Sequence, residues 1–112
     1  MSRTYTLYPD LAAEASPPAR GILSQTLSDA DGVELVLFAF AAGERLAEHT
    51  SARPAILHVL EGTGDLTLGG EASIAHPGTW ARMPANLPHS LVARTSLVMA
   101  LFLLPSVHDP DR

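Results

Sequence analysis

Two glycine-led segments decide the fold of this sequence: G-E-R-L-A-E-H-T-S-A-R-P-A-I-L-H-V-L-E-G at residues 43–62 and G-T-W-A-R-M-P-A-N-L-P-H at residues 78–89. Each segment carries a histidine, His49 in the first and His89 in the second. The residues between them read as short strands and tight turns. If these strands close on one another, both imidazoles reach the same interior pocket. The histidine pair is therefore the main sequence clue to function.

The rest of the chain continues the pattern of short strands separated by Gly, Pro, Asn and Asp turns. Gly69-Gly70 is a two-residue hairpin signal, and Ser16-Pro17-Pro18 ends whatever precedes it because proline lacks the N–H that a helix or ladder needs. Residues 10–15 allow one helical turn, and residues 4–8 allow a weak strand. The main strands are expected at residues 21–27, 33–41, 46–51, 55–61, 65–68, 71–75, 79–83, 89–94 and 96–104. Regular short strands of this kind predict an all-β sandwich or small barrel.

Composition narrows the class of protein. A chain of 112 residues with 46% apolar and 17% charged residues forms one globular domain. The formal charge of −5 argues against binding to nucleic acid or to an anionic membrane. The absence of cysteine excludes disulfides and thiolate chemistry. No signal peptide is evident at the N-terminus, and the longest apolar run, residues 97–104, is far below the roughly 20 residues of a membrane span, so we expect a soluble cytoplasmic protein.

The order of these features resembles the cupin superfamily, and most closely its small single-domain, type-2-like members. Gly43, His49 and Gly62 match the spacing of the first cupin motif, and Gly78 and His89 match the second, as does Pro84 between them. The resemblance implies a double-stranded β-helix (jelly-roll) barrel over residues 33–104. Residues 1–32 are then expected to be N-terminal strands and a linker that pack on the barrel or on a partner, and residues 105–112 a polar tail.

The resemblance also implies one divalent metal, since cupins typically hold one through three histidines and a glutamate. Here only His49 and His89 match those positions, because Ser51 stands at the second histidine and Ala55 at the glutamate. The candidate cofactor is one transition metal ion, Zn²⁺, Ni²⁺, Mn²⁺ or Fe²⁺, with His49 and His89 as ligands. The alternative is a metal-free polar pocket, because two protein ligands are fewer than the three of a usual catalytic zinc site.

His58 is the one further candidate for a metal ligand. Strand alternation opposes it: if Ala55 points inward, Leu57 and Val59 do too, and His58 points outward unless a bulge shifts the register. An outward His58 would suit a subunit interface. The expected pocket wall consists of Ser51, Ala55, Leu57, Val59 and Met83. His76 and His108, in a turn and in the tail, are expected to be exposed.

Two functions remain open from sequence alone. One is a metal-dependent enzyme acting on a small organic molecule, with His49 and His89 as ligands. The other is a non-catalytic module that binds a small-molecule ligand by burial and hydrogen bonds. Residues 33–41 and 97–104 are apolar on both faces, so the outer face needs cover. Together with the resemblance to small cupins, this predicts a C₂ homodimer.

Overall fold

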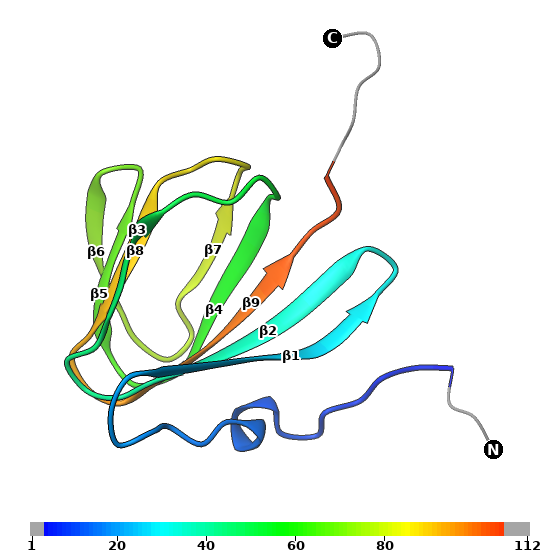
Figure 1. Cartoon of the computed structure of the whole chain (residues 1–112), viewed down its shortest axis with the longest axis horizontal. Coiled ribbons are helices and arrows are strands. Elements are labelled where there is room, and N and C mark those ends of the chain that lie inside the picture. Colours follow the sequence, from blue (N-terminus) through cyan, green and yellow to red (C-terminus); the bar gives the residue numbers. More distant parts are fainter. Residues whose placement is uncertain (1–3, 107–112) are drawn as a thin grey trace, which may run out of the picture.

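The computed structural model describes residues 4–106, which form nine strands and one short 3₁₀ turn (Figure 1). The turn is η1 (Leu11–Glu14). The strands are β1 (Ile22–Ala30), β2 (Val33–Phe40), β3 (Arg45–His49), β4 (Ala55–Glu61), β5 (Gly64–Leu68), β6 (Glu71–Ala75), β7 (Trp80–Met83), β8 (His89–Ala93) and β9 (Leu97–Leu103). Each expected main strand is present to within three residues at either end. Residues 4–8 form no strand, which corrects that expectation.

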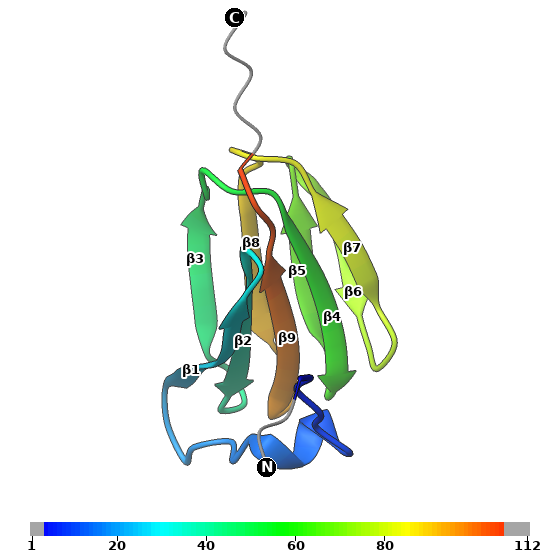
Figure 2. The same cartoon turned by 90° about the vertical axis from the view of Figure 1, so that its right-hand side faces the viewer.

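Two antiparallel sheets face each other (Figures 1 and 2). The first has five strands in the order β1-β2-β9-β4-β7, and the second has four in the order β3-β8-β5-β6. Neighbours such as β2, β9 and β4 are far apart in sequence, so the chain crosses repeatedly from one sheet to the other. The architecture is a double-stranded β-helix, or jelly-roll, barrel.

The core between the sheets follows from strand alternation. Along β4 every second residue is buried, and the buried set faces the opposite sheet. The fully buried members of this cluster come from both sheets and are at most 2% exposed: Phe40, Ala55, Leu57, Val59, Leu66, Ala75, Met83, Leu91, Ala93, Leu97 and Met99. The inner faces of the two sheets therefore meet in a single apolar layer.

The outer face of the five-stranded sheet has a second, smaller cluster, because β2 and β9 are apolar on both faces. Leu37, Val98 and Ala100 form it, and Leu11 and Ala15 of the N-terminal segment pack over it. The Tyr8 hydroxyl also donates a hydrogen bond to the Leu27 carbonyl at 2.7 Å. Tyr8, Leu11 and Ala15 thus pack the N-terminal segment against the larger sheet. β1 is the edge strand of that sheet.

The two ends of the barrel are closed differently. At one end, the β4–β5 and β8–β9 turns are joined: Arg94 N donates to the Thr63 carbonyl at 2.9 Å, and Thr63 N donates to Thr95 Oγ1 at 3.0 Å. Gly62 has a φ of +84° there and lies against the Ser96–Leu97 backbone. At the other end lie the β3–β4 and β7–β8 loops and the end of β9 (Figure 2). Both candidate histidines are at this end, since His49 is the last residue of β3 and His89 the first of β8.

Within residues 4–106, no helix is long and apolar enough to cross a membrane.

Candidate functional site

His49 and His89 lie side by side at the end of the barrel that carries the β3–β4 and β7–β8 loops. His49 ends β3 and His89 begins β8, and these antiparallel strands pair the two residues directly. Their ring centroids are 4.1 Å apart, with an angle of 61° between the ring planes. The structure therefore brings together two imidazoles that are separated by a large part of the sequence.

A β-bulge in β3 makes this arrangement compatible with the core. Leu46 pairs with Leu91 and packs on the interior cluster, and the register then shifts before His49 pairs with His89. In a regular strand, residues 46 and 49 point to opposite faces. The extra residue of the bulge turns both toward the same side of the sheet.

Each imidazole is oriented by an identical local contact. His49 Nδ1 lies 2.8 Å from the Ala47 carbonyl oxygen, and His89 Nδ1 lies 2.8 Å from the Leu87 carbonyl oxygen. A carbonyl only accepts, so Nδ1 carries the proton in both rings. In the neutral tautomer each Nε2 then presents a lone pair. The pair thus offers two adjacent nitrogen acceptors whose ring orientations are fixed by the backbone.

Both Nε2 atoms are open to solvent. His49 is exposed on edge strand β3, whereas His89 is only 8% exposed. No side-chain nitrogen or oxygen within residues 4–106 is both buried and without a hydrogen-bond partner, and the hydrogen bond of the His89 ring is made through Nδ1. The small exposed part of His89 therefore includes Nε2.

The surroundings of the pair are apolar. Several leucine side chains toward this end of the barrel face the interior and pack on the core cluster, yet remain partly exposed: Leu46, Leu68, Leu87, Leu101 and Leu103. Leu68 pairs with His89 on the far side of β8 from His49. We call the region formed by the two histidines and these five leucine side chains the mouth.

The expected pocket wall begins at the level of the mouth, where Ala55 pairs with Leu103 and with Met83, and continues inward. Ala55, Leu57, Val59 and Met83 do face the interior, but each is at most 2% exposed and packed in the core. A cavity large enough for water would leave its lining accessible. These four side chains pack in one cluster with Leu66, Leu91, Leu97 and Met99 between the sheets.

Ser51 lies in the β3–β4 loop beside the mouth. Its hydroxyl accepts a hydrogen bond from Arg53 N at 3.2 Å, and its carbonyl accepts one from Asn86 N at 2.7 Å. The second contact joins the β3–β4 loop to the β7–β8 loop that delivers His89. Ser51 thus supports the loops around the histidines.

His58 lies on the opposite face of the larger sheet. It sits between the buried, inward-facing Leu57 and Val59, and pairs with Trp80 on one side and Ala100 of the outer cluster on the other. The bulge on β4 falls after Val59, too late to turn His58 inward. His58 is therefore not brought to the mouth.

The remaining histidines do not join the pair either. His76 is exposed in the β6–β7 turn at the other end of the barrel, and its Nδ1 contacts the Pro77 carbonyl at 3.1 Å. His108 and the rest of the expected polar tail beyond Ser106 lie outside the described residues.

Sequence reasoning missed an ion pair at the same end of the barrel. Glu34 pairs with Leu103 across β2 and β9, so it shares the inner face with Phe38 and Phe40. Its carboxylate accepts from Arg53 Nη1 at 3.3 Å and from Thr26 Oγ1 at 3.2 Å. Glu34 alternates in step with Phe38 and Phe40 along the strand, so the sequence could have predicted that it faces inward. Arg53 lies in a loop, where no such alternation predicts its direction.

Arg53 is a structural clamp rather than a free cation. Its Nε donates to the Leu104 carbonyl at 3.0 Å, and Nη2 donates to the carbonyls of Gly32 at 2.8 Å and Leu103 at 3.0 Å. With the bond to Glu34, these contacts tie the β3–β4 loop to β2, to the β1–β2 turn and to the end of β9.

The donor set of the mouth fits a metal ion only in part. Fixed Nδ1 protons, free Nε2 atoms and a 4.1 Å ring separation suit two Zn–N bonds of about 2.0–2.1 Å. However, no group of three or more His, Cys, Asp or Glu side chains placed to hold a metal occurs within residues 4–106. A catalytic metal usually has at least three protein ligands. On the described residues, the set does not fit a resident metal.

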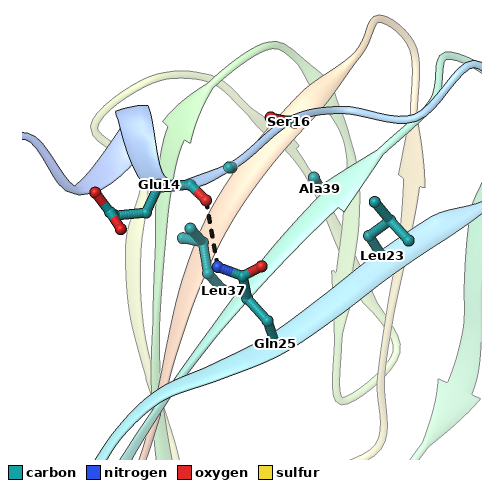
Figure 3. A pocket seen from close by; sticks show the side chains of 7 residues that line it. Glu14, Ser16, Leu23, Gln25, Leu37 and Ala39 are labelled. Carbon is teal, nitrogen blue, oxygen red and sulfur yellow. Dashed lines mark hydrogen bonds between the residues drawn. The ribbon is translucent and has the colours of Figure 1, made fainter.

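One cavity lies on the outer side of the larger sheet, away from the histidines (Figure 3). Its floor is Leu23, Leu37 and Ala39, and Glu14 and Gln25 stand at its rim, where Gln25 Nε2 donates to the Glu14 carbonyl at 3.2 Å. Its volume of about 90 Å³ admits roughly three water molecules. That is well below the roughly 300 Å³ of a typical ligand pocket, so it is a solvent notch beneath the N-terminal segment.

Comparison with known proteins identifies the fold family. The family model described as a cupin domain matches residues 36–104, which is more than half of the chain. The chain belongs to the cupin family. Within this small cupin, the match covers β3, β8 and both histidines and leaves out β1 and the N-terminal segment. No curated protein sequence matches the chain.

Solved structures agree with this assignment. A conserved protein of unknown function from Streptococcus pyogenes is 25% identical, with a TM-score of 0.79 over 96% of this chain and 93% of its own. A cupin superfamily protein from Desulfitobacterium hafniense is 23% identical, with a TM-score of 0.79 over 94% of each chain. KdgF from a Halomonas species is 26% identical, with a TM-score of 0.69 over 82% of this chain and 84% of its own. The small cupin thus has neighbours that match it over nearly their whole length.

Proposed function

We propose that this cupin binds a small organic molecule at the mouth, with the Nε2 atoms of His49 and His89 as its polar anchors and without a resident metal ion. The observation that supports this most directly is the matched orientation of the two rings, each held through Nδ1 by a backbone carbonyl. Two open acceptors within an apolar surround are the usual composition of a small-molecule site, in which a few placed polar groups orient a mainly apolar ligand.

The choice against a metal rests on the donor count. Ser51 replaces a ligand of the family and engages Arg53 N, and Ala55 replaces the carboxylate ligand and is 2% exposed in the core. Glu34 is the inward carboxylate at this end, but Arg53 and Thr26 already occupy it. No residue is therefore left at the mouth, within the described chain, to act as third ligand or as general base.

A metal-dependent enzyme is the second candidate, favoured by one specific observation. A histidine ligand usually donates its second ring nitrogen to a carbonyl or carboxylate, and both rings do so here. A bound metal would supply Lewis acidity, and His49 and His89 would hold it.

Metal titration separates the two candidates. The untagged protein is purified with EDTA, dialysed and heated with and without one equivalent of Zn²⁺, Ni²⁺, Mn²⁺ or Fe²⁺, alongside elemental analysis of the protein before EDTA treatment. We expect no stoichiometric metal and no rise in the melting temperature, since a ligand that binds only the folded state must raise stability. Stoichiometric metal that is lost in both His49→Ala and His89→Ala, but kept in His58→Ala, would replace the proposal with the metal-dependent enzyme.

Ligand binding is tested directly by NMR of the histidine ring protons. A set of aromatic and alicyclic fragments is titrated into the EDTA-treated protein, with phenol, benzoate and cyclohexanol among them. We expect at least one fragment class to shift the rings of His49 and His89 while those of His58 and His76 stay unchanged. Shifts at His58 alone, or at no histidine across the set, would contradict binding at the mouth.

We also propose that the protein is a homodimer that covers the outer face of β4 and β7. Trp80 is 59% exposed there, beside His58, while the N-terminal segment covers the neighbouring part of the face around Leu37 and Val98. Exposed tryptophan on an uncovered sheet face is characteristic of an interface. For the wild type, light scattering is expected to give a dimer mass, twice the 11.8 kDa of one chain. For Trp80→Glu it is expected to give the mass of the monomer. A wild-type monomer at micromolar concentration would contradict it.

A further inference from the structure

The polar chemistry at the mouth is unusually uniform, and this restricts the ligand that the proposed binding site accepts. His49 and His89 each present an acceptor, Nε2, because each Nδ1 proton is used by a carbonyl. The ring centroids are 4.1 Å apart, so one small ligand can contact both rings. A ligand that matches them must supply two hydrogen-bond donors.

Within the described residues 4–106, no free cation is found at the mouth to bind an anion. Arg53 donates four hydrogen bonds, one to Glu34 and three to backbone carbonyls. A carboxylate has no proton to donate, so it would require protonated imidazoles, and two positive rings at this separation repel each other. The net charge of −5 also disfavours approach of an anion.

Among the same described residues, no free anion is found there either. The Glu34 carboxylate, the inward-facing one at this end, accepts from both Arg53 and Thr26. An amine ligand would bring a charge that nothing at the mouth compensates, at a place lined by leucine side chains such as Leu68, Leu87 and Leu103. The ligand is therefore uncharged.

The walls require the rest of the ligand to be apolar. The partly exposed, inward-facing hydrophobic side chains of the mouth are five leucines, and the nearby Glu34 carboxylate is held by Arg53 and Thr26. These residues pack on a core that is at most 2% exposed, so the ligand does not reach deeper than the mouth. A compact, flat or ring-shaped body with its donors on one edge fits these limits.

We infer that the ligand class is an uncharged, mainly apolar ring compound with two hydroxyl groups on neighbouring carbons, one donated to Nε2 of each histidine. Catechol is the simplest aromatic example, and cis-cyclohexane-1,2-diol is the simplest alicyclic one. The inference rests on the proposed function and adds to it the number and kind of polar groups. It involves no bond making or breaking.

The test is a series of probes that removes one donor at a time while keeping the ring. Catechol, 2-methoxyphenol and 1,2-dimethoxybenzene are titrated by calorimetry under nitrogen and in EDTA, so that neither oxidation nor metal contributes. Benzoate is titrated as the anionic probe. The proteins are the wild type, His49→Ala, His89→Ala and the matched control His58→Ala, whose histidine lies on the other face of the sheet.

We expect catechol to bind the wild type roughly tenfold more tightly than 2-methoxyphenol, and 1,2-dimethoxybenzene more weakly again, which is the scale of one hydrogen bond per step. Each mouth variant should lower catechol affinity to about that of 2-methoxyphenol and leave the affinity for 2-methoxyphenol within about threefold. His58→Ala should bind all probes as the wild type does.

Three outcomes would overturn the inference. If the aromatic probes bind equally and the mouth variants weaken them all, the site exists but does not distinguish ligands by their number of hydrogen-bond donors. If benzoate binds the mouth more tightly than catechol, the proposed function stands and the ligand class is anionic. If no probe distinguishes the mouth variants from the wild type, and the histidine rings do not shift with any fragment, the proposed function fails as well.

Discussion

The two ends of this barrel use similar residues to opposite effect. At the end that carries Gly62 and Ser96, backbone bonds join neighbouring turns and the interior side chains, such as Phe40 and Leu97, are 0% exposed. At the mouth, inward-facing leucines stay partly exposed around two histidines. We infer from this difference that the end with Gly62 and Ser96 contributes more to the stability of the barrel. The mouth can then keep apolar side chains and histidine nitrogens exposed to solvent.

The largest effect is expected in the body of the core. Leu57→Ala removes a side chain that is 2% exposed between the sheets, and should lower the free energy of unfolding by about 2–5 kcal/mol. Leu103→Ala at the mouth should cost roughly half as much or less, because Leu103 already contacts solvent. Urea unfolding of both variants measures the difference. Equal losses would mean that the mouth is packed as tightly as the body.

The closed end is tested next by Gly62→Ala. A Cβ at this position would lie 2.1 Å from the Ser96 carbonyl oxygen and 2.8 Å from Leu97 Cα, at a φ of +84°, so the backbone must shift. We expect a loss of about 2–4 kcal/mol, from strain and overpacking together. Gly78→Ala is the matched control: its φ is +99° with nothing within 4 Å, so it should lose only about 1 kcal/mol. Thermal unfolding of the two variants decides.

Arg53→Met sharpens the comparison at the mouth. The variant keeps an apolar stem but removes the bonds to Glu34, Gly32, Leu103 and Leu104. Because the Arg53 side chain is 31% exposed, solvent partly compensates, and we expect a loss of about 1–2 kcal/mol. Amide exchange should accelerate at the end of β9 and in the β3–β4 loop, and not at Thr63. Uniform acceleration would show that Arg53 supports the whole fold.

The two histidines should differ in stability although they match in hydrogen bonding. His89→Ala removes a ring that is 8% exposed, and should cost about 1 kcal/mol, whereas His49→Ala removes an exposed ring and should stay within about 0.5 kcal/mol. Chemical denaturation of both variants checks this. A large loss in His49→Ala would mean that its ring stabilises the barrel, and ligand-binding results on that variant would then need His49→Gln as a second test.

The smallest effect is expected outside both the core and the mouth, at Arg94. Its bidentate hydrogen bonds to Asp65 raise the pKa of Arg94 above its ordinary value, but the side chain is 54% exposed. A raised pKa adds stability that is present at all pH values below the unfolded pKa and is lost only as the pH rises past the folded one, far into alkali. Arg94→Gln should therefore have the melting temperature of the wild type, with the same pH dependence between pH 5 and 9. A clear difference would assign this exposed pair a part in closing the barrel.

Much of the architecture follows from local signals. The alternation of apolar residues and the Gly/Pro turns predicted all nine strands, and the bounds of β4 and β6 were correct at both ends. These signals are local, because a strand with one buried face alternates apolar and polar residues and a tight turn favours Gly or Pro. Motif spacing placed His49 and His89 in equivalent positions of two strands, and inward parity from Ala55 correctly oriented Leu57, Val59 and the opposite face of His58.

Tertiary structure alone decided the character of the site. The bulge in β3 lets Leu46 and His49 share a face, although strict alternation opposes it. Whether inward residues line a pocket or a packed core depends on the opposing sheet, so the burial of Ala55 and Met83 is not visible in their own strands. The contacts of Arg53 with Glu34, Gly32 and Leu104 join segments distant in sequence. The sequence by itself determined the strands and the positions of His49 and His89 on them, because both depend on neighbours along the chain. The tertiary structure decided the packing of the core, the partial exposure of the mouth and the engagement of the Glu34 carboxylate, because these depend on neighbours across the barrel.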